Sequence, residues 1–260
     1  MKEELVAGWK REEELAHMRG WDFSHIDGRY RDFPLPWDYA EIVKGLLRPD
    51  MRLLDFDTGG GELLLSFGHP CAMTAATEGW PPNVALCRET LSPLGIDFRE
   101  CADARAIPFE DGRFDMVVNS HGSMDENEFF RLLAPGGIFV TEQVGSENDR
   151  ELVELLLPGA EKPFPDENPA VQVPRFEKAG FELLRTEEAF RPMEFYDVGA
   201  IVWFARVVEW EFPGFSVEAC LPGLMEAQRL IETEGKVSTL AHRYLIVARK
   251  PARAGRDQAV

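Results

Sequence analysis

An apolar run that breaks into three consecutive glycines constrains this chain more than any other feature. Residues 53–56 are Leu-Leu-Asp-Phe, residues 59–61 are the glycines, and residues 63–65 are leucines. This pattern predicts a buried parallel strand, a tight turn and the start of a helix. Glycines permit positive φ and let a ligand approach the main chain, and a helix start offers free N–H groups. The stretch therefore predicts a binding turn for a nucleotide-like ligand.

Two acidic residues farther along the chain each follow a strand-like run. Glu78 closes residues 72–78, and an acidic side chain at the end of a second strand accepts hydrogen bonds from the hydroxyls of a ribose. We predict that Asp103 ends a third strand, where it would hold an adenine amino group. Residues 114–118 then open a fourth strand.

This series of strand ends, over residues 50–185, resembles the class I S-adenosylmethionine-dependent methyltransferases. The resemblance implies an α/β fold with a Rossmann-like, seven-stranded, mostly parallel sheet, helices on both faces and an antiparallel last strand. It also implies S-adenosylmethionine as the methyl donor, S-adenosylhomocysteine as the product and a small-molecule acceptor as the partner. The residues carried over to the donor site are Asp55, Asp57, Thr58, Gly59, Gly60, Gly61, Glu78, Gly79, Trp80, Asp103, Ala104 and Asn119.

Asp57 stands where the family pattern has glycine. It adds a negative charge beside the ligand, which a cationic sulfonium tolerates and a pyrophosphate does not. The dinucleotide fingerprint G-x-G-x-x-G is also absent, and phosphates would face Asp55, Asp57 and Glu62. The methyl donor is therefore favoured over a dinucleotide.

A histidine, an acidic residue and several aromatic residues are the candidates for the acceptor site. His121 follows the fourth strand, at the edge where ligands of open α/β sheets sit, and an imidazole with a pKa of about 6.5 suits a general base. It could instead only order its loop, and each aromatic could seal a helix instead of lining a pocket. The predicted substrate-binding residues are Trp21, Trp37, Tyr39, His121, Glu142 and Trp203.

The sequence divides into five predicted segments. They are a helical and aromatic lid (1–50), a donor-binding core (51–185), a helical substrate cap (186–240), the final strand (241–250) and a disordered tail (251–260). Within the core, residues 145–174 are predicted to form an irregular surface excursion, because acidic residues and prolines accumulate there.

Charge and composition exclude several classes of protein. The 260 residues carry a formal net charge of −18 without a basic cluster, which disfavours nucleic acid as a partner because phosphate contacts need Lys and Arg. We find no apolar run long enough to cross a bilayer and no signal peptide, so we expect a cytoplasmic protein without a membrane partner. The four cysteines lack C-x-x-C spacing, which predicts reduced thiols and no metal site.

Two other functions remain compatible with the same resemblance. An RNA base methyltransferase would use a related sheet, although the acidity and the absence of an N-terminal cysteine cluster disfavour it. The second is a non-catalytic protein that binds the donor without turnover, and Asp57 is the strongest argument for it.

Overall fold

Two units, each assembled from three stretches of the chain, account for residues 2–18 and 22–252, which the computed structural model describes. Unit 1 comprises Met1–Pro36, Gly145–Pro165 and Ala189–Arg243, and unit 2 comprises Trp37–Val144, Asp166–Glu188 and Tyr244–Val260. The chain therefore alternates between two units, whereas the sequence analysis divided it into consecutive segments. The predictions for Trp21 and for residues 253–260 lie outside the described residues.

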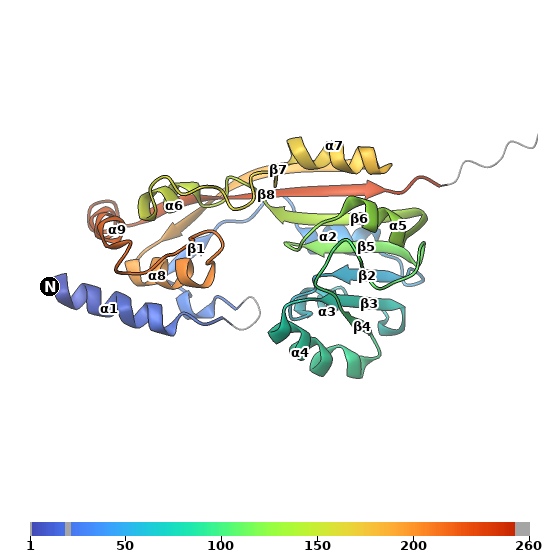
Figure 1. The fold of residues 1–260 in the computed structure, drawn as a ribbon, viewed down its shortest axis with the longest axis horizontal. Coiled ribbons are helices and arrows are strands. Elements are labelled where there is room, and N and C mark those ends of the chain that lie inside the picture. Colours follow the sequence, from blue (N-terminus) through green and yellow to red (C-terminus); the bar gives the residue numbers. More distant parts are fainter. Residues whose placement is uncertain (1, 19–21, 253–260) are drawn as a thin grey trace, which may run out of the picture. The chain divides into compact units, whose positions relative to one another are not determined.

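The described residues of unit 2 include five strands that pair in parallel, in the order β6-β5-β2-β3-β4. In Figure 1 they lie one below the other in this order. All residues of β2 and β3 are buried, as expected for strands covered on both faces. The strands are β2 (Leu53–Phe56), β3 (Thr74–Glu78), β4 (Asp97–Glu100), β5 (Phe114–Ser120) and β6 (Leu133–Val144).

Aromatic side chains attach two helices to one face of these strands. Phe139 of β6 stacks on Phe129 of α5 with ring centroids 4.6 Å apart, and on Phe176 of α7 at 5.2 Å. Leu54 and Phe56 of β2 belong to the same buried cluster. The helices of unit 2 are α2 (Tyr39–Leu46), α3 (Glu62–Ser66), α4 (Pro81–Thr90), α5 (Glu126–Leu132) and α7 (Pro169–Ala179), with short 3₁₀ helices at Cys71–Met73 and Ser92–Leu94.

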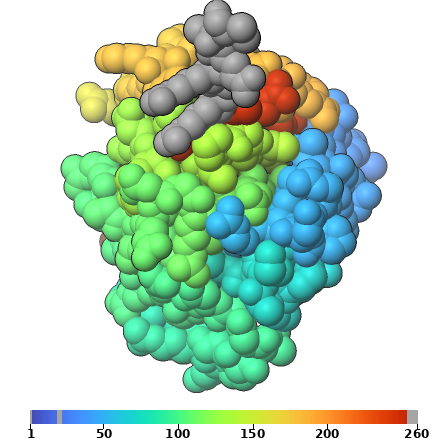
Figure 2. Space-filling model, turned by 90° about the vertical axis from the view of Figure 1, so that its right-hand side faces the viewer, coloured from blue at the N-terminus to red at the C-terminus, as the bar shows by residue number. Residues whose placement is uncertain are grey.

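At the surface of unit 2, segments far apart in the sequence lie side by side. Figure 2 shows the light-blue segment near residue 50 against green segments. Arg52 donates from Nε and Nη2 to the carboxylate of Asp115, at 2.9 and 3.0 Å. An exposed pair of this kind contributes about 0–1 kcal/mol to stability.

Among the described residues the sheet has eight strands, so the predicted count of seven is wrong. Its order is β1-β7-β8-β6-β5-β2-β3-β4, where β1 is Tyr30–Asp32, β7 is Glu182–Phe195 and β8 is Val237–Arg249. The additional strand is β1, which pairs antiparallel with β7 from Tyr30↔Phe195 to Asp32↔Met193. Such a pairing depends on residues distant in the sequence, so a local pattern does not reveal it.

Backbone hydrogen bonds confirm the direction expected for the last strand. Lys250, just after β8, exchanges hydrogen bonds with Gly136 and Gly137 near the start of β6. Gly145, just after β6, donates to the carbonyl of His242 within β8. The end of β8 thus meets the start of β6, and the two strands are antiparallel.

Unit 1 is rich in helices, and one of them is buried over most of its length. Eight consecutive residues of α8, from Val198 to Ala205, are buried. Residues 145–174, predicted as irregular, contain α6 and the first half of α7, so that prediction is wrong. The helices of unit 1 are α1 (Lys2–Leu15), α6 (Arg150–Leu156), α8 (Val198–Val207) and α9 (Leu221–Glu234), with a 3₁₀ helix at Ser24–Ile26. Among the described residues, none of the helices has the length and apolar character needed to cross a membrane.

Candidate functional site

The glycine turn follows β2, as the sequence predicts. Asp57, Gly59 and Gly61 have φ values of 55°, 64° and 85°, in the left-handed region that favours glycine. Gly61 precedes α3, and a Cβ there would lie 2.7 Å from a methyl carbon of Leu91. Thr58 closes the turn, because its Oγ1 donates to Asp55 Oδ2 at 2.6 Å.

Glu78 ties this turn to the next one. It is the last residue of β3 and only 6% exposed. Its Oε2 accepts a hydrogen bond from Gly59 N, and its Oε1 accepts from Gly79 N and Trp80 N, each at 2.8 Å. Bonds from N–H groups to a carboxylate are among the stronger hydrogen bonds in proteins. Glu78 therefore holds the backbone of both turns in place.

The turn carries negative charge. Burial raises the pKa of Asp55 to about 7; the Thr58 hydrogen bond opposes this rise, and the charges of Asp57 and Glu78 add to it. Burial likewise raises the pKa of Asp57. Within residues 2–18 and 22–252, none of these three carboxyl groups forms an ion pair with Lys, Arg or His. The turn therefore suits a cationic ligand and disfavours a phosphate.

Cys87 of α4 lies within the field of the same carboxylates. Its thiol donates to Gly59 O at 3.1 Å. Burial raises the pKa of Cys87 to about 12, and the charges of Glu78, Glu62 and Asp55 raise it further in that order. The thiol therefore stays protonated and serves as a hydrogen-bond donor to the turn.

Asp103 does not end a strand, because β4 ends at Glu100 and Asp103 lies in the loop that follows. Its carboxylate accepts from Arg105 N, Nε and Nη2 at 2.9–3.0 Å, and these bonds lower the pKa of Asp103 to about 2. The predicted strand end is thus wrong by three residues. Asp103 remains a charged group on the surface beside Ala104.

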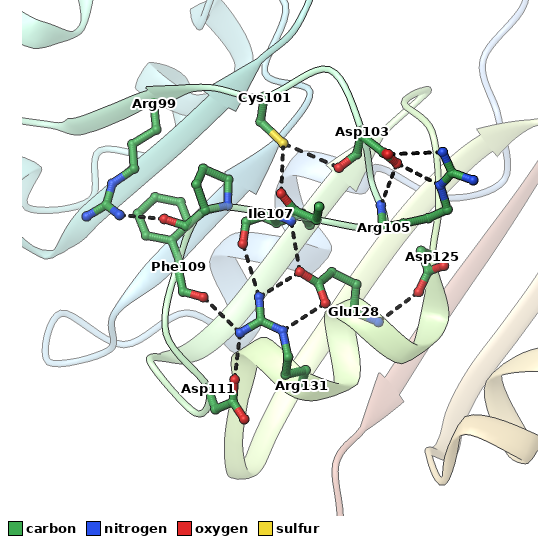
Figure 3. A network of polar contacts seen from close by, with 12 residues as sticks. Arg99, Cys101, Asp103, Arg105, Ile107, Phe109, Asp111, Asp125, Glu128 and Arg131 are labelled. Carbon is green, nitrogen blue, oxygen red and sulfur yellow. Dashed lines mark hydrogen bonds and ion pairs between the residues drawn. The ribbon is translucent and has the colours of Figure 1, made fainter.

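Two residues of α5 hold the loop that carries Asp103 (Figure 3). Arg131 donates to the carbonyls of Ile107 and Phe109 at 3.0 and 2.8 Å, and to Asp111 Oδ1 at 2.7 Å. Glu128 accepts from Ile107 N at 2.8 Å. Sequence analysis missed this pair. Its spacing of three residues on a helix is visible in the sequence, but its loop partners are not.

Asn119 near the end of β5 is fully buried and bonded within the sheet. Its Nδ2 donates to Phe56 O at 3.0 Å, and its Oδ1 accepts from Gln143 Nε2 and from Thr141 Oγ1. Asn119 thus connects the end of β2 with β6. This network aligns the strand ends around the turn.

Four of the predicted acceptor residues, His121, Glu142, Trp37 and Tyr39, lie in unit 2. His121 Nε2 is 3.5 Å from Glu142 Oε1, and Trp37 Nε1 donates to Glu142 Oε2 at 2.5 Å. Tyr39 donates to Val140 O at 3.3 Å. Burial raises the pKa of Tyr39 well above its usual value, and the charges of Asp55 and Glu142 raise it further.

The remaining predicted aromatic residues differ in their surroundings. Trp80 is 53% exposed directly after Glu78. Trp203 belongs to unit 1, where it is 1% exposed and stacks on His25 with centroids 5.4 Å apart. Its place in an acceptor pocket stays a prediction.

The described part of the chain contains no group of three or more His, Cys, Asp or Glu residues that could hold a metal ion. All four cysteines are free thiols, and only Cys71 is partly exposed. The groups that could bind a ligand or take part in a reaction at the ends of these strands are carboxylates, an imidazole and backbone N–H groups.

Comparison with known proteins identifies the domain that carries the turn. The sequence profile of a family described as a methyltransferase domain matches residues 54–141. A demethylmenaquinone methyltransferase of Thermus thermophilus is 34% identical over 116 residues, covering 41% of this chain and 53% of the relative. A phthiotriol/phenolphthiotriol dimycocerosates methyltransferase of Mycobacterium tuberculosis is 29% identical over 119 residues, covering 46% and 37%. The chain thus spans about half the length of these curated relatives, or less.

Solved structures show the same fold. A crystal structure of a candidate methyltransferase from Bacillus halodurans has a TM-score of 0.59 at 18% identity, covering 83% of this chain and 99% of that one. Together with the strand order and the match to the profile, this likeness confirms the predicted resemblance. Residues 54–141 therefore match a methyltransferase domain, within a chain that has a Rossmann-like α/β fold.

Proposed function

We propose that this protein is an S-adenosylmethionine-dependent methyltransferase that acts on a small, partly hydrophobic acceptor. The observation that carries the proposal is the glycine turn of a methyltransferase domain, lined by three carboxyl groups that have no counter-cation among the described residues. When bound, the donor supplies an activated methyl group: the acceptor's electron pair forms the new bond to carbon, and the pair of the broken bond stays on sulfur.

The donor residues divide by the part of the ligand that they would hold. Glu78 would accept the ribose hydroxyls, and Asp103 with Ala104 would contact the adenine. Trp80 offers an exposed ring for stacking on that base. The carboxylates of Asp55 and Asp57 favour the positive charges of the donor. Because the donor is already activated, the protein mainly has to align the reactants and exclude water.

His121 is the proposed general base for the acceptor. The carboxylate of Glu142 lies 3.5 Å from its Nε2, a position that stabilises the imidazolium formed when His121 takes the acceptor's proton. Trp37 fixes the other oxygen of that carboxylate. This arrangement supports His121 as a base that the Glu142 carboxylate orients. General-base catalysis of this kind raises the rate by about 10²–10⁴-fold.

The names of the relatives support the class of acceptor. The name of one relative includes the word demethylmenaquinone, and the name of the other includes phthiotriol. Both relatives match only part of this chain, so the acceptor is proposed as a class: a small molecule with a hydrophobic portion. Trp37 and Tyr39 would supply apolar contacts for it.

Calorimetry with S-adenosylmethionine and S-adenosylhomocysteine tests donor binding. The Glu78→Ala variant should bind each of the two ligands more weakly by about 1.5–3 kcal/mol. It loses the hydrogen bonds that the carboxylate would accept from the ligand, and it loses the bonds that hold the backbone of both turns. Glu100→Ala is the matched control, since Glu100 pairs in register with Glu78 on β4 but binds Arg88 at the surface. Equal affinities in the two variants would reject Glu78 as a donor residue.

Turnover separates an enzyme from a protein that only binds the donor. Incubation with labelled donor and a set of hydroxylated, ring-containing lipids should transfer the label to at least one of them. Donor binding with no transfer to any acceptor, including RNA, would support the non-catalytic alternative.

A further inference from the structure

Position 57 departs from the family pattern, and the structure shows how the chain accommodates the departure. Asp57 has a φ of 55°, in a region that costs most L-residues about 1–2 kcal/mol and that Asp tolerates better than most. A Cβ at Gly122 would lie 2.6 Å from Asp57 Cβ and 2.4 Å from Asn119 Nδ2. The side chain of Asp57 thus occupies space that glycine at position 122 leaves open.

Two hydrogen bonds fix the direction of the Asp57 carboxylate. Its Oδ2 accepts from Ser123 N at 3.0 Å and from Ser123 Oγ at 2.8 Å. Ser123 lies in the loop after β5, next to the segment that carries His121. The carboxylate is therefore held against the glycine turn instead of extending into solvent.

The charge held in this way has no ion-pair partner in the parts of the chain that the structure describes. Asp55 and Glu78 are its charged neighbours, and both have the same sign. A family member with glycine at this position has one negative charge fewer at the same turn. The donor and the product of a methyl transfer differ by one positive charge, because the sulfonium becomes a neutral thioether.

We infer that Asp57 is a specificity-determining residue that makes the donor site prefer S-adenosylmethionine over S-adenosylhomocysteine. The inference rests on the proposed function. The Asp57 carboxylate attracts the sulfonium and loses that attraction once the methyl group has left, whereas hydrogen bonds to the ribose and contacts with the adenine are the same for both ligands. Compared with a site that binds the donor equally well but has glycine at position 57, this site therefore binds the product less tightly.

Two variants test the inference by calorimetry with both ligands at about pH 8, because burial raises the pKa of Asp57 and a higher pH favours its charged form. Asp57→Asn removes the charge and keeps an oxygen that can accept both hydrogen bonds from Ser123. Asp57→Gly restores the family residue and relieves the positive φ, so its backbone is unstrained. Asp115→Asn is the control, because it removes one charge from an exposed ion pair in the same unit.

In both Asp57 variants, the preference for S-adenosylmethionine over S-adenosylhomocysteine, measured as the ratio of their dissociation constants, should fall by about five- to tenfold. This is the scale of one partly screened charge pair. The control should leave the ratio unchanged. A ratio that stays the same in Asp57→Gly overturns the inference and leaves the proposed function standing. Failure of the unaltered protein to bind either ligand overturns both. A purely structural role for Asp57 would weaken both ligands equally, and this outcome also overturns the inference.

Discussion

At the scale of single residues, Asp55 links donor binding to pH. Its pKa of about 7 means that the ligand-free carboxyl group holds a proton over much of the range below neutrality. A cationic ligand favours the carboxylate form, so binding should release that proton. We expect the affinity for S-adenosylmethionine to rise from about pH 6 to about pH 8, by up to roughly tenfold for one unit of pKa. Titration calorimetry across this range would measure it.

Two variants test whether Asp55 causes this pH dependence of donor affinity. Asp55→Asn should flatten the profile, whereas Asp115→Asn should keep it, because Asp115 lies in an exposed ion pair with Arg52. An affinity that falls with rising pH would contradict the assignment of Asp55 to the site of a cation.

His121 gives a second prediction at this scale. It has a φ of 58°, so His121→Asn suits the backbone better than His121→Ala, since Asn is enriched in the left-handed region. The Asn variant should lower kcat by about 10²–10⁴-fold while leaving donor affinity nearly intact, because it cannot act as a general base. Turnover and melting temperature measured on one preparation would test this. Full activity in the folded variant would end the role of His121 as a base.

The residues of the donor turn follow from the sequence to different degrees. The glycines and Glu78 are predictable, because an apolar strand positions each of them. The contact between Asp57 and Ser123 is not, since the two residues are 66 positions apart and meet only in the folded sheet. The same reason hides the approach of Trp37 and His121 to Glu142.

At the scale of helices and strands, length and apolar pattern decide what the sequence reveals. The buried strands β2 and β3 consist mostly of apolar or small residues and were predictable. Helix α6 was not, because acidic residues on its exposed side obscure the apolar face formed by Leu152, Val153 and Leu156. Strand β1 is three residues long and mostly exposed, so only its partner β7 defines it.

The start of α6 provides a prediction about stability. Burial raises the pKa of Asp149 to about 7; Arg243 opposes this rise, and the charge of Glu211 adds to it. Asp149 Oδ1 is buried and has no hydrogen-bond partner among the residues that the structure describes. The folded state therefore binds more protons than the unfolded state between about pH 4 and pH 7, and the free energy of unfolding falls as pH rises through that range.

Asp149→Asn should reduce this fall and raise the free energy of unfolding at about pH 8 by about 1–3 kcal/mol, from 1.4 kcal/mol for each unit of pKa. Asn also tolerates the φ of 53° at this position. Asp125→Asn is the control, because the Asp125 carboxylate accepts a hydrogen bond from Glu128 N at the start of α5. Chemical denaturation at two pH values would measure both, and a variant less stable than the parent at the higher pH would contradict the prediction.

At the scale of the whole molecule, the net charge of −18 predicts that the protein does not bind RNA. Mixed RNA should not bind in a gel-shift assay at low salt, where phosphate contacts are strongest. The same assay with rising salt is the control for weak, non-specific association. Tight binding with a steep salt dependence would instead support an RNA base methyltransferase.

The alternation of the chain between two units has a consequence for biosynthesis. Each unit needs three separate stretches, and the last stretch of unit 1 ends at Arg243. On the ribosome, neither unit can acquire all its native contacts until residues up to Arg243 or beyond have emerged, although domains of other proteins commonly fold one after another from the N-terminus. Nascent chains that end before β8 therefore lack the strand that lies between β6 and β7 in the sheet, and they are the species that chaperones would have to protect.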